Sequence, residues 1–288
     1  DALSLDRDES GNSVLGVHIA DVSHFVKKGS ALDREARQRG NSVYLPDKVI
    51  PMLPEELSNN VCSLMPQVDR LAFSVFLTFD RTGNCVGAGF QRSVIRSSHR
   101  FNYREALALI SGQSNGSETG ATAKVVKLVK ELARVSRSLR KKRLARTALD
   151  FDLPDTEVVI DKKGMIKEIR KVENDRSHQL VEECMLAANQ AVAMELQKNK
   201  YPLIYRIHEA PRPEKLDALR QDLTAMGYQP GNLSSRSNLA RFVRSVKGDP
   251  LEHHVHTAIL RCMNRAIYSA RNAGHFGLAM DTYTHFTS

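Results

Sequence analysis

Two strand-like segments joined by a four-residue turn constrain the fold more than any other feature of the sequence. Leu71–Asp80 and Cys85–Ile95 are rich in apolar and β-branched residues, and Arg81-Thr82-Gly83-Asn84 between them favours a turn. Because so short a connection joins antiparallel neighbours, the pair is predicted to form a hairpin. Two further segments show the same pattern, 2–19 with a turn at Asp6–Asn12 and 158–172 with a turn at Lys162–Gly164. The chain therefore contains antiparallel β-structure.

Segments with helical periodicity separate these hairpins. Helices are predicted at Leu32–Arg39, Tyr103–Ile110, Ala121–Arg146 and about Asp175–Lys198, followed by a short strand at Leu203–His208 and further helices. Val43–Pro54 contains three prolines, which predicts an extended, rigid loop. Hairpins mixed with helices, without a repeat or a low-complexity linker, predict a single mixed α/β domain over residues 1–288.

Composition favours some classes of protein and excludes others. The 42 Lys and Arg residues exceed the 33 Asp and Glu residues, and the net charge of +9 favours an anionic partner such as nucleic acid or acidic lipid. The longest mostly apolar run, Leu71–Phe79, is too short to cross a bilayer. Four cysteines without a CxxC pair argue against a zinc ribbon and a disulfide-stapled fold, and favour a reduced, cytoplasmic protein. No signal peptide is visible in the given sequence, and the commonest hydrolase and nucleotide-binding fingerprints do not occur in it.

A line of basic residues follows one face of the predicted helix Ala121–Arg146. Its members recur at three- and four-residue steps opposite the apolar residues, and they are Lys124, Lys127, Lys130, Arg134, Arg137 and Lys141. Two interpretations stay open, a solvated helix face and a surface that binds phosphates without sequence preference. Docking of this helix to a membrane is a third, weaker hypothesis.

Three other polar groups have simpler interpretations. The acidic cluster at Asp6–Glu9 lacks the further ligands of a calcium loop and is interpreted as a turn. His253–His256 is interpreted as a surface or helix-start feature rather than a zinc site. His178 and Glu182 share one face of a helix, with Glu183 beside them, and their spacing favours an internal ion pair.

Several short segments resemble, in the same order, motifs of the catalytic (RNB) domain of the ribonuclease II/ribonuclease R family. Their sequences are more similar to those of ribonuclease R than to those of ribonuclease II. The resemblance extends over essentially the whole chain. It is carried by Asp1–Leu5, Gly16–Ser23, Ser42–Pro46, Ile50–Pro54, Leu57–Ser58, Cys62–Leu64, His178–Met185, Arg206–His208, His275–Leu278 and Tyr283–Ser288.

The resemblance implies both a fold and an activity. The fold would be a mixed, barrel-like β-sheet core wrapped by helices around a narrow RNA channel. The activity would be processive 3′-to-5′ exoribonuclease cleavage of single-stranded RNA to nucleoside 5′-monophosphates, with Mg²⁺ in a two-metal mechanism. Flanking cold-shock and S1-type RNA-binding domains would complete the parent chain, and no membrane partner is expected.

Five residues match functional positions of the family. Asp1 matches the last of four metal-binding aspartates and is expected to be a catalytic metal ligand. Tyr44 and Phe151 match aromatic residues that clamp the stacked bases, although the residues alone favour loop packing and core packing for them. Tyr103 and Glu182 match a pair that positions the terminal nucleotide and its ribose, which makes them expected catalytic and RNA-binding residues.

The ends of the chain leave an alternative open. The family's other three aspartates would lie upstream of Asp1, and the string with a phosphate-binding arginine would begin after Ser288. The resemblance therefore implies a domain fragment that cleaves little RNA by itself. The alternative is a non-catalytic RNA-binding module with a degenerate metal site.

Overall fold

The computed structural model describes residues 1–151, 155–161 and 164–287. The chain divides into two units, the first formed by residues 1–134 and 154–180, the second by residues 135–153 and 181–288. Helices α4 (Ala123–Ala145) and α5 (Arg176–Lys198) each begin in the first unit and end in the second. None of the helices described has both the length and the hydropathy of a bilayer-spanning segment.

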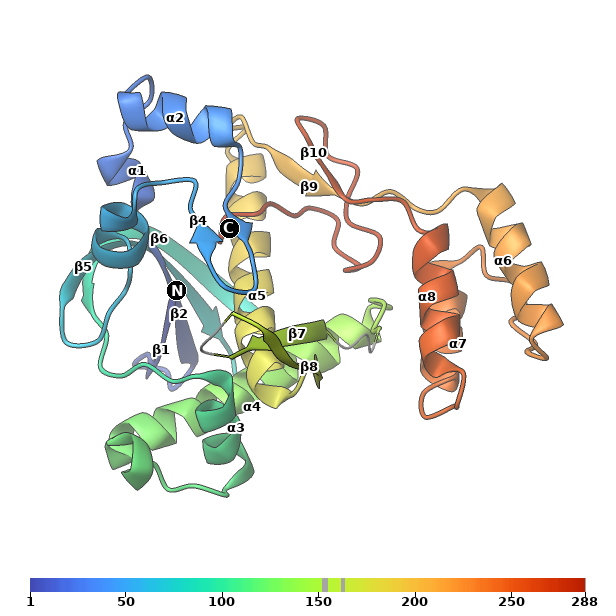
Figure 1. Cartoon of the computed structure of the whole chain (residues 1–288), viewed down its shortest axis with the longest axis horizontal. Coiled ribbons are helices and arrows are strands. Elements are labelled where there is room, and N and C mark those ends of the chain that lie inside the picture. The colour runs from blue at the N-terminus through green and yellow to red at the C-terminus, as the bar shows by residue number, and fades with distance from the viewer. Residues whose placement is uncertain (152–154, 162–163, 288) are drawn as a thin grey trace. The chain divides into compact units, whose positions relative to one another are not determined.

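A four-stranded antiparallel sheet forms the centre of the first unit (Figure 1). Its strand order is β1-β2-β5-β6, with bounds Ala2–Arg7, Ser13–Ala20, Asp69–Phe79 and Cys85–Arg96. Leu15 lies opposite Leu77 and Val17 opposite Val75, and all four side chains are buried. This alternation of apolar residues fixes the register, because a slip by one residue would turn them to the other face.

A chain of polar side chains crosses the other face of the sheet. The ring of His18 lies 3.0 Å from the hydroxyl of Ser4 and 2.7 Å from that of Ser74, which lies 2.5 Å from the hydroxyl of Ser93. Each strand thus supplies one member, and burial lowers the pKa of His18. Position 16 must be glycine, because a Cβ there would lie 2.2 Å from the Ser4 hydroxyl and 2.7 Å from the His18 ring.

Short elements complete the first unit. They are α1 (Val22–Phe25), α2 (Ala31–Arg39), β3 (Val43–Tyr44), β4 (Val49–Ile50), a π-helical turn (Glu56–Val61), α3 (Tyr103–Ser111), a 3₁₀ turn (Ser117–Thr119), β7 (Asp155–Ile160) and β8 (Ile166–Val172). Leu109 of α3 is buried with Val126 and Val129 of α4, so the apolar side of α4 packs against α3.

Three helices, α6 (Pro213–Ala225), α7 (Arg236–Ser245) and α8 (Glu252–Cys262), share one apolar core in the second unit. Leu223, Leu239 and Ile259, one from each helix, are fully buried in it. Strands β9 (Tyr205–Ile207) and β10 (Ile267–Ser269) pair antiparallel in the second unit.

The predicted mixed α/β class, the hairpins and the long helices are confirmed. Within the described residues β1 and β6 are free edges of the large sheet, so the barrel-like core is an open sheet rather than a closed barrel. Val43–Pro54 is not loop throughout, because Val43 and Tyr44 pair with Ile50 and Val49 in a small hairpin. Two residues of the third predicted turn, Lys162 and Lys163, lie outside the described residues.

Candidate functional site

Tyr44 presents its ring to solvent from the β3–β4 hairpin. It is 78% exposed, so its side chain does not pack the loop, which was the alternative interpretation. The loop is held by other groups, since Arg39 donates to the carbonyl of Pro51 at 3.0 Å and the amide of Met52 donates to Ser42 at 2.9 Å. An exposed aromatic ring on a tied loop is suited to stacking on a planar ligand.

Tyr103 is the first residue of α3 and stacks on His178. The ring centroids are 3.8 Å apart and the planes differ by 19°. A capping box of Asn102 and Glu105 fixes the start of α3, and therefore the position of Tyr103. Tyr103 is 48% exposed, so one part of it contacts His178 while the rest is accessible.

Asp175 orients the His178 ring from the start of α5. Its Oδ1 lies 3.0 Å from Nδ1 of His178 and accepts the backbone amide of Ser177 at 2.8 Å. Burial would raise the pKa of Asp175, but the hydrogen bonds from Ser177 and His178 hold it below its ordinary value. Asp175, His178 and Tyr103 thus form a connected group within the first unit.

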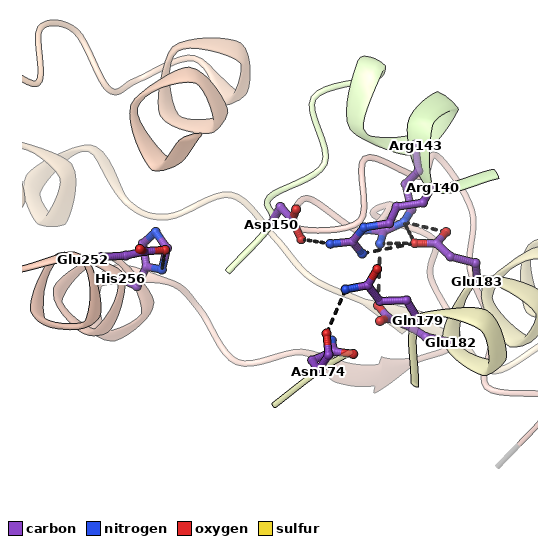
Figure 2. A network of polar contacts seen from close by, with 9 residues as sticks. All are labelled: Arg140, Arg143, Asp150, Asn174, Gln179, Glu182, Glu183, Glu252 and His256. Atoms are coloured by element: carbon purple, nitrogen blue, oxygen red, sulfur yellow. Dashed lines mark hydrogen bonds and ion pairs between the residues drawn. The ribbon is translucent and has the colours of Figure 1, made fainter. Parts of the chain in front are cut away.

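Arg143 and Glu183 form a buried ion pair in the second unit (Figure 2). Nη2 of Arg143 lies 2.6 Å from Oε1 of Glu183, and the side chains are only 8% and 2% exposed. Burial would lower the pKa of Arg143, but the hydrogen bonds and charge of Glu183 raise it. Arg140 adds a second guanidinium, 3.5 Å from Glu183 and also paired with Asp150.

Glu182 lies beside this pair but is more accessible. Its Oε1 is 3.6 Å from Nη2 of Arg143, and its side chain is 39% exposed. The expected internal ion pair is therefore formed by Glu183 with Arg143, whereas His178 pairs with Asp175 rather than with Glu182. A half-exposed carboxylate with a cation on one side retains lone pairs that accept hydrogen bonds from a ligand hydroxyl.

Phe151 packs against the core of the second unit. It meets His256 edge to face, with centroids 5.6 Å apart and planes at 79°. This contact matches the core interpretation, and the base-clamping role of Phe151 stays a prediction. His256 is itself buried in α8, whereas His253 and His254 are exposed.

Asp1 is exposed and immediately precedes β1. In the part of the chain that the structure describes, no three His, Cys, Asp or Glu side chains are grouped so as to hold a metal ion. The turn interpretation of the acidic cluster has direct support, because Asp8 accepts both the backbone and the side-chain amide of Asn12. The metal role of Asp1 stays a prediction.

Two of the family-like segments, Arg206–His208 and His275–Leu278, lie far apart in the sequence but contact each other in the second unit. The rings of His208 and His275 are 5.0 Å apart, and the amide of Gly277 donates to Nδ1 of His208 at 3.2 Å. Burial and the neighbouring charges of His208 and Arg206 lower the pKa of His275 to about 4. Each motif therefore helps to position another.

Asn189 holds the last of these motifs. Its amide donates to the hydroxyls of Tyr283 and Thr287 at 3.0 Å each, and it accepts the backbone amide of Thr287 at 2.9 Å. A single buried side chain therefore fixes the segment from Tyr283 to Thr287.

The structure distributes the five predicted residues over both units. Asp1, Tyr44 and Tyr103 belong to the first, whereas Phe151 and Glu182 belong to the second. No sequence pattern predicted His178 as the partner of Tyr103, Arg143 as the partner of Glu182 and Glu183, or the role of Asn189. One signal for Arg143 was present, because Arg140 and Arg143 fall outside the phase of the basic line on the same helix.

A protein-family model described as RNB domain matches residues 1–288, the entire chain. The chain belongs to the RNB domain family. Ribonuclease R 1 of Lactococcus lactis is 40% identical over 292 residues, which cover 100% of this chain and 35% of that protein.

Two solved structures share the fold. Mycoplasma genitalium RNase R in complex with ribose-methylated single-stranded RNA matches with a TM-score of 0.93 and 32% identity, covering 100% of this chain and 45% of that one. Yeast Ssd1, described as a pseudonuclease, matches with a TM-score of 0.77 and 21% identity, covering 99% of this chain and 35% of that one, and shows likeness of fold alone. This chain thus spans less than half the length of each of these relatives.

Proposed function

We propose that the protein containing this chain is an exoribonuclease that degrades single-stranded RNA processively from its 3′ end and releases nucleoside 5′-monophosphates. The observation that carries the proposal is the RNB match over residues 1–288, together with about 40% identity along the whole chain to a protein named Ribonuclease R.

Exposed aromatic rings support binding of RNA without sequence preference. Tyr44 and Tyr103 are 78% and 48% exposed. Stacking on such rings contributes roughly 1–3 kcal/mol per base and tolerates any base, because every base has a π-face. In this proposal Tyr44 and Phe151 hold the bases near the 3′ end, and His178 supports the ring of Tyr103 from behind.

Glu182 would help to distinguish RNA from DNA, the role that the family resemblance gives to it and to Tyr103. A 2′-hydroxyl donates to a carboxylate, and deoxyribose lacks this group. The guanidinium of Arg143, 3.6 Å from Glu182, orients that carboxylate while part of it stays accessible. Deoxyribose would leave Glu182 without this hydrogen-bond partner, which lowers its affinity.

Magnesium is proposed on the family resemblance alone. Asp1 is the one residue here that matches the expected aspartate string, and one carboxylate does not hold two hard cations. The described residues thus do not fit a two-metal site, and no metal-dependent step is assigned to them. Residues 1–288 by themselves are expected to cleave little RNA, and robust metal-dependent degradation by this segment would contradict that expectation.

The decisive experiment incubates the full-length protein with labelled single-stranded RNA and Mg²⁺ and separates the products by length. Mononucleotides are expected from RNA, with little product from DNA of the same sequence. A protein with all four aspartates that releases none would refute the proposal.

A non-catalytic RNA-binding module is the second candidate. It would combine the exposed rings of Tyr44 and Tyr103 with a degenerate metal site, and no three potential metal ligands are grouped among the described residues. The two candidates are distinguished by comparing RNA binding with RNA cleavage in the full-length protein. Binding that persists while Mg²⁺-dependent cleavage is absent would support the module.

Two further properties belong to the same proposal. We propose a cytoplasmic location, because all four cysteines are free thiols and a reducing compartment keeps them so. Flanking cold-shock and S1-type domains would account for the length of the relatives that this chain does not cover. Limited proteolysis of the full-length protein tests the second point, since stable fragments outside the RNB segment are expected.

A further inference from the structure

Helix α4 carries a line of cations that face solvent. Nine of its 23 residues are Lys or Arg, and Glu131 is its one acidic residue. Six of these cations form the line identified above, and all six are exposed: Lys124, Lys127, Lys130, Arg134, Arg137 and Lys141. We call these six residues the basic face of α4.

The other side of the same helix accounts for its folding. Val126, Val129, Leu132 and Ala133 are buried, and the two valines pack against Leu109. The basic face therefore makes no contribution to the apolar core that positions α4.

Two arginines of α4 outside the basic face are largely buried and form ion pairs within the protein. Arg140 and Arg143 are 18% and 8% exposed and pair with Asp150 and Glu183. By contrast, the ion pairs found among the described residues include none of the six cations of the basic face. Their charge is thus available to a partner outside the chain.

We propose that the basic face of α4 binds the sugar-phosphate backbone of RNA, in addition to the stacking residues. Between Lys124 and Lys141 it extends about 25 Å at 1.5 Å per residue, long enough for several phosphates of one strand. Contacts of this kind add affinity without reading sequence, as a processive enzyme requires. The inference rests on the proposed function only for the identity of the ligand.

A lipid surface fits the same charge less well. Helices that lie on membranes insert an apolar face between headgroups and acyl chains. In α4 that face is already buried by the protein at Val126, Val129 and Leu132. RNA needs only the exposed cations, which is why the structure favours RNA.

The test measures RNA binding by the full-length protein across a series of KCl concentrations, with EDTA present to prevent cleavage. The probe is a fluorescein-labelled single-stranded oligoadenylate, followed by anisotropy. The test variant is Lys124→Gln/Lys127→Gln/Lys130→Gln. Its control, Lys198→Gln/Lys215→Gln/Lys247→Gln, removes the same charge from exposed lysines elsewhere.

The test variant is expected to bind RNA more weakly and to reduce the slope of log K against log salt by about 2, because each phosphate that a lysine neutralises adds about 0.7 to that slope. The control variant is expected to keep the wild-type slope, and both variants should unfold at the wild-type urea concentration because the substituted side chains are exposed.

Equal slopes for the test and control variants, in a protein that does bind RNA, would overturn this inference alone. No RNA binding by the wild type would overturn the proposed function as well. Unchanged RNA binding together with abolished binding to phosphatidylserine vesicles would overturn the inference and assign the basic face to lipid instead.

Discussion

Replacing Glu183 by leucine leaves the guanidinium of Arg143 buried without its principal partner. The pair is 2.6 Å apart, and both side chains are less than a tenth exposed. Arg143→Met/Glu183→Leu instead removes both charges and fills the space with apolar groups. The two variants therefore separate the cost of an unpaired charge from the net contribution of the pair.

The expected cost can be worked out from the neighbours. Breaking a buried ion pair destabilises by about 3–5 kcal/mol, whereas replacing both partners by apolar residues is often neutral or stabilising. Arg143 still has Glu182 at 3.6 Å, and Arg140 still has Asp150. Glu183→Leu is therefore expected at the lower end, about 3 kcal/mol, and the double variant within about 1 kcal/mol of wild type.

Urea unfolding followed by far-ultraviolet circular dichroism measures both values. Glu157→Leu is a matched control, because Glu157 and Arg170 are 2.7 Å apart but 50% and 41% exposed. That exposed pair is expected to contribute little to stability, because water and salt screen it. A cost of Glu183→Leu no larger than that of Glu157→Leu would contradict this expectation, and so would a double variant as unstable as the single one.

Three further predictions follow from single residues. Tyr44→Ala removes a stacking ring that contributes about 1–3 kcal/mol per base, so RNA binding should weaken and the final product should change in length. An unchanged product ladder would exclude Tyr44 from the RNA path. His178→Ala should weaken RNA binding by about 2- to 12-fold, because an aromatic pair contributes about 0.5–1.5 kcal/mol. His178→Phe keeps an aromatic ring and should bind RNA nearly as well as the wild type. Equal effects of the two substitutions would rule out stacking with Tyr103 as the cause. The folded pKa of His275 is about 4 against 6.5, so the unfolded chain binds more protons between these values and the free energy of unfolding should fall as pH drops through that range. His275→Gln should lessen this dependence in urea titrations, and an unchanged pH profile would contradict it.

Local sequence patterns predicted most of the helices and hairpins. The turn at Arg81-Thr82-Gly83-Asn84 predicted the β5–β6 hairpin, and the apolar steps in 121–146 predicted both α4 and the exposure of its basic face. These signals are local, because periodicity and turn chemistry act between residues a few positions apart. The small hairpin at Tyr44 was missed because prolines around it suggested a loop.

The site depends on pairs that are distant in sequence, and no local pattern contains them. Tyr103 meets His178, and Arg143 meets Glu183, only after α3, α4 and α5 are packed. Spacing alone pointed to His178 with Glu182, since both lie on one helix face, but Asp175 at the helix start is a closer partner for His178. The family resemblance supplied candidate residues, whereas the structure supplied the neighbours that position them.

The order in which labelled RNA ends are released shows whether the full-length protein is a 3′-to-5′ exoribonuclease. The full-length protein is mixed with Mg²⁺ and single-stranded RNA that carries one label at the 3′ end and a different label at the 5′ end. Exonucleolytic degradation from the 3′ end predicts that the 3′ label appears first, as a mononucleotide, while the 5′ label stays on progressively shorter RNA. Early release of the 5′ label, internal fragments, or intact RNA that is nonetheless bound would contradict exonucleolytic degradation from the 3′ end.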